Sequence, residues 1–168
     1  LLGFPLPLGL CLGAIALSAW LNIFLSIRWR KSVRLQPAHA GLLLAYDICQ
    51  LAVLLYLTGG LGNPFAFLFL VPVTISATSL SLQWTLWLGA TAFFCATFLA
   101  FRYYPLPWHP GTTLTLPDAY IGGMWTAIIC GVVFSAIYAR RIAVEARQMS
   151  SALSATEMVL AREQRLSA

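Results

Sequence analysis

Seven residues, GGLGNPF at positions 59–65, join two apolar runs and carry groups that could bind a small polar ligand. The three glycines of this loop allow positive φ and leave backbone N–H groups without side-chain cover. They are Gly59, Gly60 and Gly62. Asn63 and Pro64 form a good helix start, because Asn caps free amides and Pro fits the first helical turn. The loop therefore ends one helix and begins another within a few residues.

Aromatic side chains flank the loop, with Tyr56 before it, Phe65 at its end and Phe67 beyond. The hydroxyl of Thr58 and the amide of Asn63 converge between them. Polar groups framed by apolar and aromatic walls suit a ring with two carbonyls and a lipid tail, which describes a quinone. A plain tight turn is the simpler interpretation of the same residues. The join has more special residues than a turn needs, so a binding site is kept as a second interpretation beside the turn.

Asp47 is the only acidic residue deep within an apolar run. Gln50 lies on the same helical face at i+3, and Thr58 returns nearly to that face eleven residues on. An ionised carboxylate inside a membrane is costly, so we expect Asp47 to be neutral or paired. A buried interhelical hydrogen bond is the favoured role, and a proton-linked role in quinone reduction is the alternative.

Other residue types that could do chemistry are present without a matching pattern. His39 and His109 are predicted at opposite edges of the membrane, too far apart to hold one haem. No metal-binding spacing, hydrolase triad or phosphate loop is found, so no metal and no catalytic residue are expected. The cysteines lie in separate apolar segments and are interpreted as small apolar residues. They are Cys11, Cys49, Cys95 and Cys130.

The composition indicates an integral membrane protein whose first partner is the lipid bilayer. Of the 168 residues, 60% are hydrophobic and 9% are charged. A soluble domain has about 25% charged residues. The net charge of +5 comes from basic residues grouped in two places, so it does not indicate nucleic-acid binding.

Five apolar segments predict an all-α, polytopic membrane bundle at residues 1–139. Four of them have close to the roughly 20 residues that cross about 30 Å of hydrocarbon. The third is shorter, and Pro72 within it predicts a kinked helix. The predicted spans are about 8–27, 40–58, 64–81, 82–101 and 118–139.

The basic residues predict the orientation of the bundle, because cytoplasmic loops are enriched in Lys and Arg. One cluster lies in the first loop and the other follows the last span, so both are predicted to be cytoplasmic. The loops at 59–65 and 103–117 then face outward, residue 1 lies outside and residue 168 inside. An additional preceding helix would give six spans in the parent protein. The clusters are Arg28, Arg30, Lys31 and Arg34, then Arg140, Arg141, Arg147, Arg162 and Arg165.

Two helices carry stripes of small residues that permit close helix packing, within one chain or between two. Residues 140–168 follow as a linker helix with a weak heptad seam. We expect this helix to pair with that of a second copy; the alternative is an amphipathic helix on the membrane surface. The stripes are Gly9, Gly13, Ala14, Ser18, Asn22 and Ser26, and Gly123, Ala127, Gly131, Ser135 and Ala139. The seam is Ile142, Ala146, Met149, Leu153, Thr156 and Leu160.

The chain resembles the RegB/PrrB/ActS family of redox-sensing membrane histidine kinases. That family carries a GGxxNPF heptapeptide between two spans, matched here by Gly59, Gly60, Asn63, Pro64 and Phe65. The resemblance includes DICQL at 47–51, continues through PLPWHPG at 105–111 and reaches the C-terminus. It covers essentially the whole chain.

The resemblance implies six membrane helices in a bacterial inner membrane, ubiquinone recognition at the heptapeptide and a cytoplasmic C-terminus. It also implies a homodimeric kinase that phosphorylates a response regulator. Here the chain stops before the phosphoacceptor histidine and lacks an ATP-binding region, and the family's redox-active cysteine belongs to the kinase portion. The fragment is therefore expected to be a sensor, with enzyme activity in the parent.

Two other functions fit parts of the sequence. A small transporter or channel would use Asp47, Gln50 and the Pro72 helix break as a pathway through the membrane. A plain membrane anchor or dimerisation module would need no ligand. Among these, a quinone-binding sensor uses the loop most fully.

Overall fold

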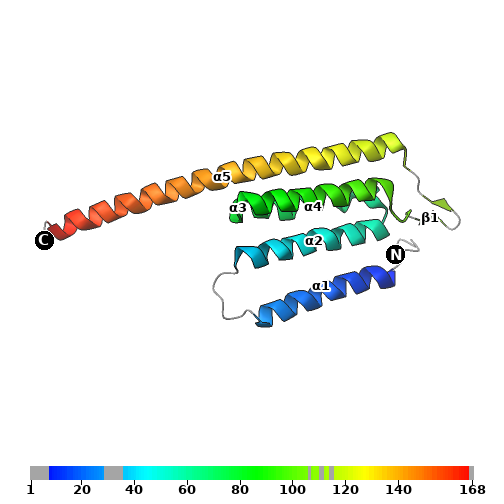
Figure 1. Ribbon diagram of the computed structural model, residues 1–168, viewed down its shortest axis with the longest axis horizontal. Helices are drawn as coiled ribbons and strands as arrows, with labels where there is room; N and C mark the ends of the chain where they lie inside the picture. Colours follow the sequence, from blue (N-terminus) through cyan, green and yellow to red (C-terminus); the bar gives the residue numbers. More distant parts are fainter. Residues whose placement is uncertain (1–7, 29–35, 106, 110–111, 114–115, 167–168) are drawn as a thin grey trace.

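The computed structural model describes residues 8–28, 36–105, 107–109, 112–113 and 116–166. Its helices lie side by side as a bundle of rods, and the last one extends far beyond the others (Figure 1). Apart from one short hairpin, the regular structure of these residues is helical. The helices are α1 (Leu8–Arg28), α2 (Pro37–Leu57), η1 (Gly60–Gly62), η2 (Pro64–Phe69), α3 (Leu70–Ser79), α4 (Leu82–Phe101) and α5 (Asp118–Leu166).

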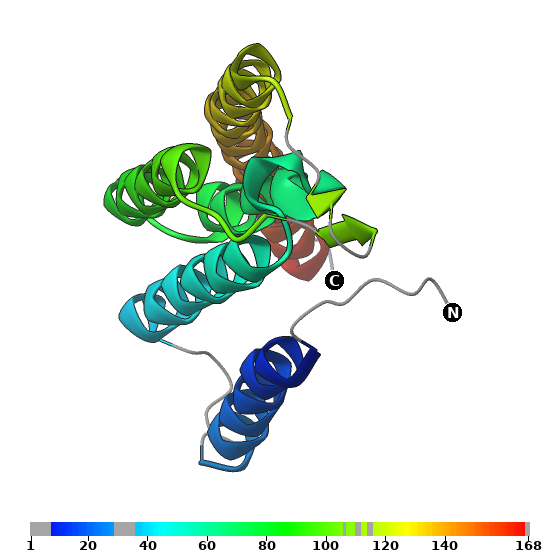
Figure 2. The same ribbon diagram turned by 90° about the vertical axis from the view of Figure 1, so that its right-hand side faces the viewer.

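The predicted fold class, a polytopic helical membrane bundle, is confirmed. Within the described residues, three helices are long and apolar enough to cross a membrane: Pro37–Leu57, Leu82–Phe101 and Asp118–Met158. Leu8–Leu21 and Pro64–Ser79 form shorter apolar helices. Seen end-on, α3 lies in the middle of the bundle and α1 at its edge beside α2 (Figure 2).

The third segment is not the kinked α-helix that Pro72 predicted. It begins as the six-residue 3-10 helix η2 and continues as the ten-residue α3. Pro72 stands in the first turn of α3, where a missing N–H costs little. Because a 3-10 helix rises about 2.0 Å per residue against 1.5 Å for an α-helix, the segment reaches about 27 Å. The third segment, although it has fewer residues, therefore comes close to the length of the neighbouring helices.

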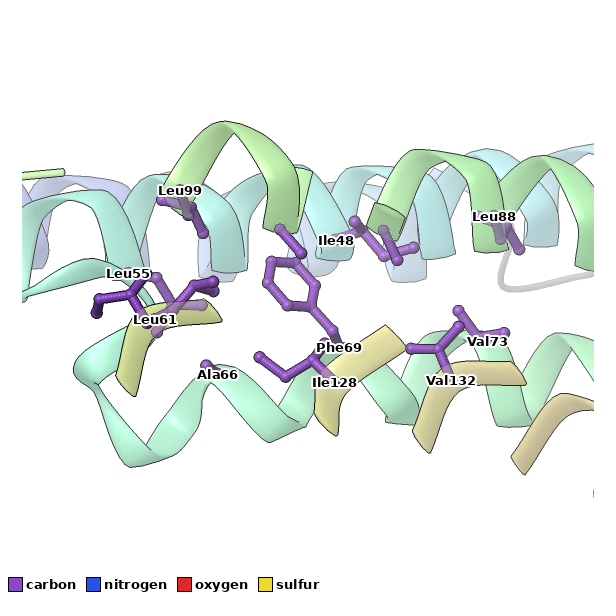
Figure 3. Close-up of a cluster of buried hydrophobic side chains, with 13 residues drawn as sticks. Ile48, Leu55, Leu61, Ala66, Phe69, Val73, Leu88, Leu99, Ile128 and Val132 are labelled. Atoms are coloured by element: carbon purple, nitrogen blue, oxygen red, sulfur yellow. The ribbon is translucent and has the colours of Figure 1, made fainter. Parts of the chain in front are cut away.

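The core lies where α2, α3, α4 and α5 meet. Phe69, at the end of η2, is fully buried in the middle of this cluster (Figure 3). Two members, Leu61 and Ala66, come from the short join between α2 and α3 and are also fully buried. The join is therefore part of the core. The other buried side chains are Ile48, Leu55, Val73, Leu88, Ala92, Ala96, Leu99, Ile121, Ile128 and Val132.

The two ends of the bundle differ. At one end, here called the loop end, lie residues 58–65, the end of α4, the start of α5 and the hairpin of β1 (Pro107–His109) with β2 (Thr112–Thr113) (Figure 1). The two loops predicted to share a side therefore do share an end. At the opposite end, the exit end, α5 leaves the bundle. The side of the membrane that each end faces stays a prediction.

The α5 helix is continuous from Asp118 to Leu166, so the last predicted span and the linker helix form one rod. Ile142, Met149 and Leu153 of the seam are 63%, 68% and 63% exposed on the single chain. Pairing of this seam with a second copy stays a prediction.

The small-residue stripes behave differently on the two helices. A Cβ added at Gly9 or Gly13 of α1 would meet no heavy atom within 4 Å. On α5, a Cβ at Gly131 would lie 3.2 Å from Cδ2 of Leu70, although Gly123 is open. Gly131 therefore lets α5 approach α3, whereas these α1 glycines bring no other described helix close.

A close contact between α2 and α4 allows a direct test of packing. A Cβ at Gly41 of α2 would overlap the indole of Trp84 on α4. We expect Gly41→Ala to destabilise the bundle by about 1–3 kcal/mol through this overlap. Gly13→Ala, which meets nothing, should keep or raise stability because Ala is the better helix former. Thermal unfolding of the detergent-solubilised chain, followed by circular dichroism, compares the two; equal midpoints would contradict the packing.

Candidate functional site

The glycines at the start of the loop are required by the backbone. Gly59 has φ 101° and Gly60 has φ 62°, both in the left-handed region. A left-handed residue directly after the last turn is a common way to end an α-helix, and here it ends α2. Side chains beyond glycine are disfavoured in that region by about 1–2 kcal/mol per residue. The reversal of the chain after α2 therefore depends on these two positions.

Asn63 holds the join together from the inside. Its Oδ1 accepts a hydrogen bond from the Phe65 amide at 2.9 Å, which confirms the predicted cap. Its Nδ2 donates to Oγ1 of Thr58 at 2.8 Å and to the Thr58 carbonyl at 3.2 Å. The Thr58 hydroxyl in turn donates to the Leu54 carbonyl at 2.7 Å. Both donors of the Asn63 amide are therefore used within the loop.

The loop also packs tightly against the segment that follows α4. A Cβ at Gly60 would lie 2.7 Å from Cβ and Cγ of Tyr103, and one at Gly62 would lie 2.5 Å from Cδ1 of Leu116. The amide of Tyr104 donates a hydrogen bond to the Tyr56 carbonyl at 2.8 Å. The glycines thus shape a close contact between two loops, in addition to forming a turn.

Aromatic side chains provide the accessible surface of the loop. Phe65 is 64% exposed and Phe67 is 47% exposed, and Pro64 is exposed as well. Tyr56 stacks on Phe98 of α4 with ring centroids 6.1 Å apart. Of the residues predicted from the motif, Phe65 and Pro64 are therefore the exposed ones, whereas Gly59, Gly62 and Asn63 are half-buried.

A cavity of about 700 Å³ lies beside the loop, between the end of α4 and the start of α5. Its size falls within the range of about 300–1,000 Å³ that is usual for small-molecule sites. Tyr103, which packs on Gly60, also lines this cavity and so joins it to the loop. The lining residues are Thr97, Ala100, Phe101, Tyr103, Asp118, Ile121, Gly122 and Trp125.

The cavity combines aromatic walls with a few polar groups. Nε1 of Trp125 donates to Oγ1 of Thr97 at 3.1 Å, and that hydroxyl donates to the Phe93 carbonyl at 2.7 Å. The exposed Asp118 lies at the first turn of α5, where a carboxylate complements the helix dipole. Sequence reasoning missed this cavity, because its residues are far apart in the chain and form no motif.

Asp47 is not placed as predicted. Ile48 next to it is fully buried, whereas Asp47 is exposed and forms no hydrogen bond within the described part of the chain. The predicted buried interhelical hydrogen bond is therefore wrong for a single chain. The reason is helical geometry, since α2 buries the face of Gly41, Ile48 and Leu55 and Asp47 lies about 100° away. Gln50 is half-buried.

The remaining candidates do not form a second site. His39 lies near the start of α2 and His109 in β1, at opposite ends of the bundle as predicted (Figure 1). Among the described residues, no three His, Cys, Asp or Glu side chains are grouped to hold a metal ion. The cysteines are free thiols.

Comparison with known proteins places this bundle in a family. A family model described as a PilS-like transmembrane domain matches residues 6–151. The chain belongs to this family. The match includes the whole of the described bundle and the part of α5 that packs within it. No solved structure matches the chain.

The relatives of this PilS-like domain confirm the resemblance indicated by the heptapeptide. The chain is 44% identical over 165 residues to sensor histidine kinase RegB of Cereibacter sphaeroides. The aligned region covers 98% of this chain and 36% of the relative. A second RegB sequence of that species is 45% identical over the same length and coverage. The chain thus spans about a third of the length of these curated relatives.

The bond between Asn63 and Thr58 can be measured by a double-mutant cycle. We expect Asn63→Ala and Thr58→Val each to lower stability, because each removes hydrogen bonds at the end of α2. The double variant should lose less than the sum, with a coupling of about 1 kcal/mol. Chemical unfolding in mixed micelles gives the free energies. Strict additivity would show that the contact does not stabilise the loop.

Proposed function

We propose that this chain is the membrane input domain of a sensor histidine kinase, and that it binds oxidised ubiquinone at the loop end. The RegB relatives support the first part. The proposal of ubiquinone binding is based on the cavity of about 700 Å³, which is joined to the GGLGNPF loop through Tyr103. Aromatic walls with few polar groups, opening at the edge of an apolar bundle, suit a flat dicarbonyl ring with a lipid tail.

The predicted quinone-binding residues then take two roles. Gly59, Gly60, Gly62 and Asn63 shape the loop and hold Tyr103 in place. Pro64 and Phe65 offer exposed surface to the ring or its tail, with Tyr56 and Thr58 supporting them from α2. Asp47 and Gln50 lie about 16 Å and about 12 Å before Thr58 along α2 and have no direct contact with the ring in this proposal.

The route from the loop to the exit end runs through α3. This helix continues directly from η2, and its contact with α5 is the most extensive in the bundle. At its far end, Nη2 of Arg147 on α5 donates to the Thr78 carbonyl at 2.7 Å. A ligand that prefers one packing of the loop over another shifts the population of α5 positions through this contact.

In the parent protein this shift reaches the kinase. We propose a homodimer held by the last span and the α5 seam, in a bacterial inner membrane with a cytoplasmic C-terminus. The parent phosphorylates a cognate response regulator, and the present chain contributes no catalytic group. The transporter alternative gains no support, because Pro72 is buried within the bundle and Asp47 points out of it.

Two substitutions test the binding site from its two sides. Phe65→Ala removes the exposed ring of the loop, and Gly122→Leu fills the cavity, where an added Cβ would meet nothing within 4 Å. We expect at least one of them to weaken binding of oxidised ubiquinone by about tenfold or more, since burying one ring contributes about 1.5–3 kcal/mol. Equilibrium binding to the purified chain in nanodiscs measures the affinity.

Matched variants show whether the effect is local. Phe24→Ala removes another exposed ring, on α1 towards the exit end, and Gly89→Leu adds the same volume to α4 in the other half of the bundle. Both should leave ubiquinone affinity unchanged. Saturable binding that neither loop-end variant affects would overturn the proposed site. If the folded chain bound no ubiquinone, the proposal that ubiquinone is the ligand would be wrong.

The Arg147 contact predicts that ubiquinone binding and the kinase response to it can be separated by mutation. In the full-length parent, Arg147→Gln removes the bond to Thr78 far from the loop and should leave ubiquinone affinity unchanged. The change in autophosphorylation on adding ubiquinone should shrink several-fold, because the hydrogen bond between the end of α3 and α5 is lost. Arg102→Gln, a charge-matched change at the loop end, is the control. An undiminished response in Arg147→Gln would rule out this route.

A further inference from the structure

A second hollow lies between α4 and α5, in the half of the bundle nearest the exit end. It is a groove of about 380 Å³ and shares no lining residue with the loop-end cavity. A Cβ added at Gly89 in its wall would meet no heavy atom within 4 Å, so the groove is open at its centre. Its lining is apolar except for Thr85 and Arg140. The residues are Val73, Leu82, Thr85, Leu86, Gly89, Ala90, Phe93, Ile129, Val132, Val133, Ala136, Ile137 and Arg140.

The length of the groove matches one leaflet of a membrane. Along α4 it runs from Leu82 to Phe93, which corresponds to about 17 Å of helical rise. The hydrocarbon core of a bilayer is about 30 Å thick, so one leaflet accounts for about half of that. A single acyl chain entering from the exit end would therefore fill the groove and stop near Phe93.

The exit end of the groove is cationic. Arg140 lines both the groove and an adjoining hollow of about 580 Å³, which Arg141 also lines. Arg140 lies about 33 Å along α5 from Asp118, close to one hydrocarbon thickness and so at the level of lipid phosphates. Within the described residues, neither arginine forms an ion pair or a hydrogen bond. Glu145 is the acidic group of this hollow, which leaves an excess of positive charge.

We propose that this groove is a selective site for one anionic phospholipid. One of its two acyl chains lies along Gly89 and Ala90, and its phosphate is bound by Arg140 and Arg141. Guanidinium groups bind phosphate oxygens with paired hydrogen bonds, and basic pockets between membrane helices are suited to anionic headgroups. The charge at the end of an apolar groove of leaflet length is what favours a phospholipid over a neutral chain.

Such a lipid would link α4 to α5 at the point where α5 leaves the bundle. Arg147, which holds α5 to the end of α3, lies two turns beyond Arg140. The lipid and this bond then act on the same stretch of the signalling helix. The position of α5 would depend on the anionic lipid content of the membrane, independently of any ligand at the loop end.

The test measures lipid retained by the purified chain in neutral detergent, by native mass spectrometry. The probes are dioleoylphosphatidylglycerol, which is anionic, and dioleoylphosphatidylcholine, which is zwitterionic. We expect one phosphatidylglycerol to be retained per chain, in preference to phosphatidylcholine. The double variant Arg140→Gln, Arg141→Gln should weaken phosphatidylglycerol binding about thirtyfold, since each cation near the surface contributes about fivefold. Arg102→Gln, at the loop end, should have no effect.

Filling the groove tests the acyl-chain half of the site. Gly89→Leu should reduce phosphatidylglycerol retention severalfold, whereas Gly122→Leu in the loop-end cavity should not. Equal retention of the two lipids, or retention unchanged in the arginine double variant, would overturn the proposal. A change of oligomeric mass in Gly89→Leu with lipid retention intact would assign the groove to a second copy instead. Ubiquinone affinity, measured in the same variants, separates this site from the proposed quinone site.

Discussion

The amide of Asn63 joins the end of α2 to the start of η2, and the central part of the bundle depends on that join. Because this reversal of the chain is partly buried against the bundle, its backbone polar groups must be satisfied internally. Asn63 does so through Thr58 and the Phe65 amide. With these groups satisfied, Leu61 and Phe69 on either side can enter the core, where they meet α4 and α5 (Figure 3).

The same join determines which helices of the bundle are attached to one another. Because η2 passes directly into α3, we expect a displacement at the loop to move α3 along with it. The close approach of Gly131 to Leu70 and the bond from Arg147 to Thr78 attach α5 to α3 along its length. In contrast, α4 and α5 are separated by hollows at both ends. The bundle thus has one tightly coupled pair of helices and one pair whose spacing a bound molecule can change.

Much of this arrangement follows from local sequence signals. The left-handed glycines, the Asn63 cap and the helical apolar segments each depend on a few neighbouring residues, and the structure agrees with those expectations. The orientation of Asp47 could not be obtained in this way, because it depends on which face of α2 meets α4. The 3-10 start of the third segment buries Ala66 and Phe69, and no local sequence signal predicted it. The two hollows are lined by residues that are far apart in the sequence, so no sequence motif predicts them.

We expect ligand binding at the loop end to reach α5 through α3. Hydrogen–deuterium exchange of the chain in nanodiscs, with and without oxidised ubiquinone, measures this effect. Ubiquinone should increase protection of the Gly59–Phe69 amides and change exchange in α5 around Arg147, while α1 stays unaffected. Protection confined to the loop, or appearing in α1 with none in α5, would contradict it.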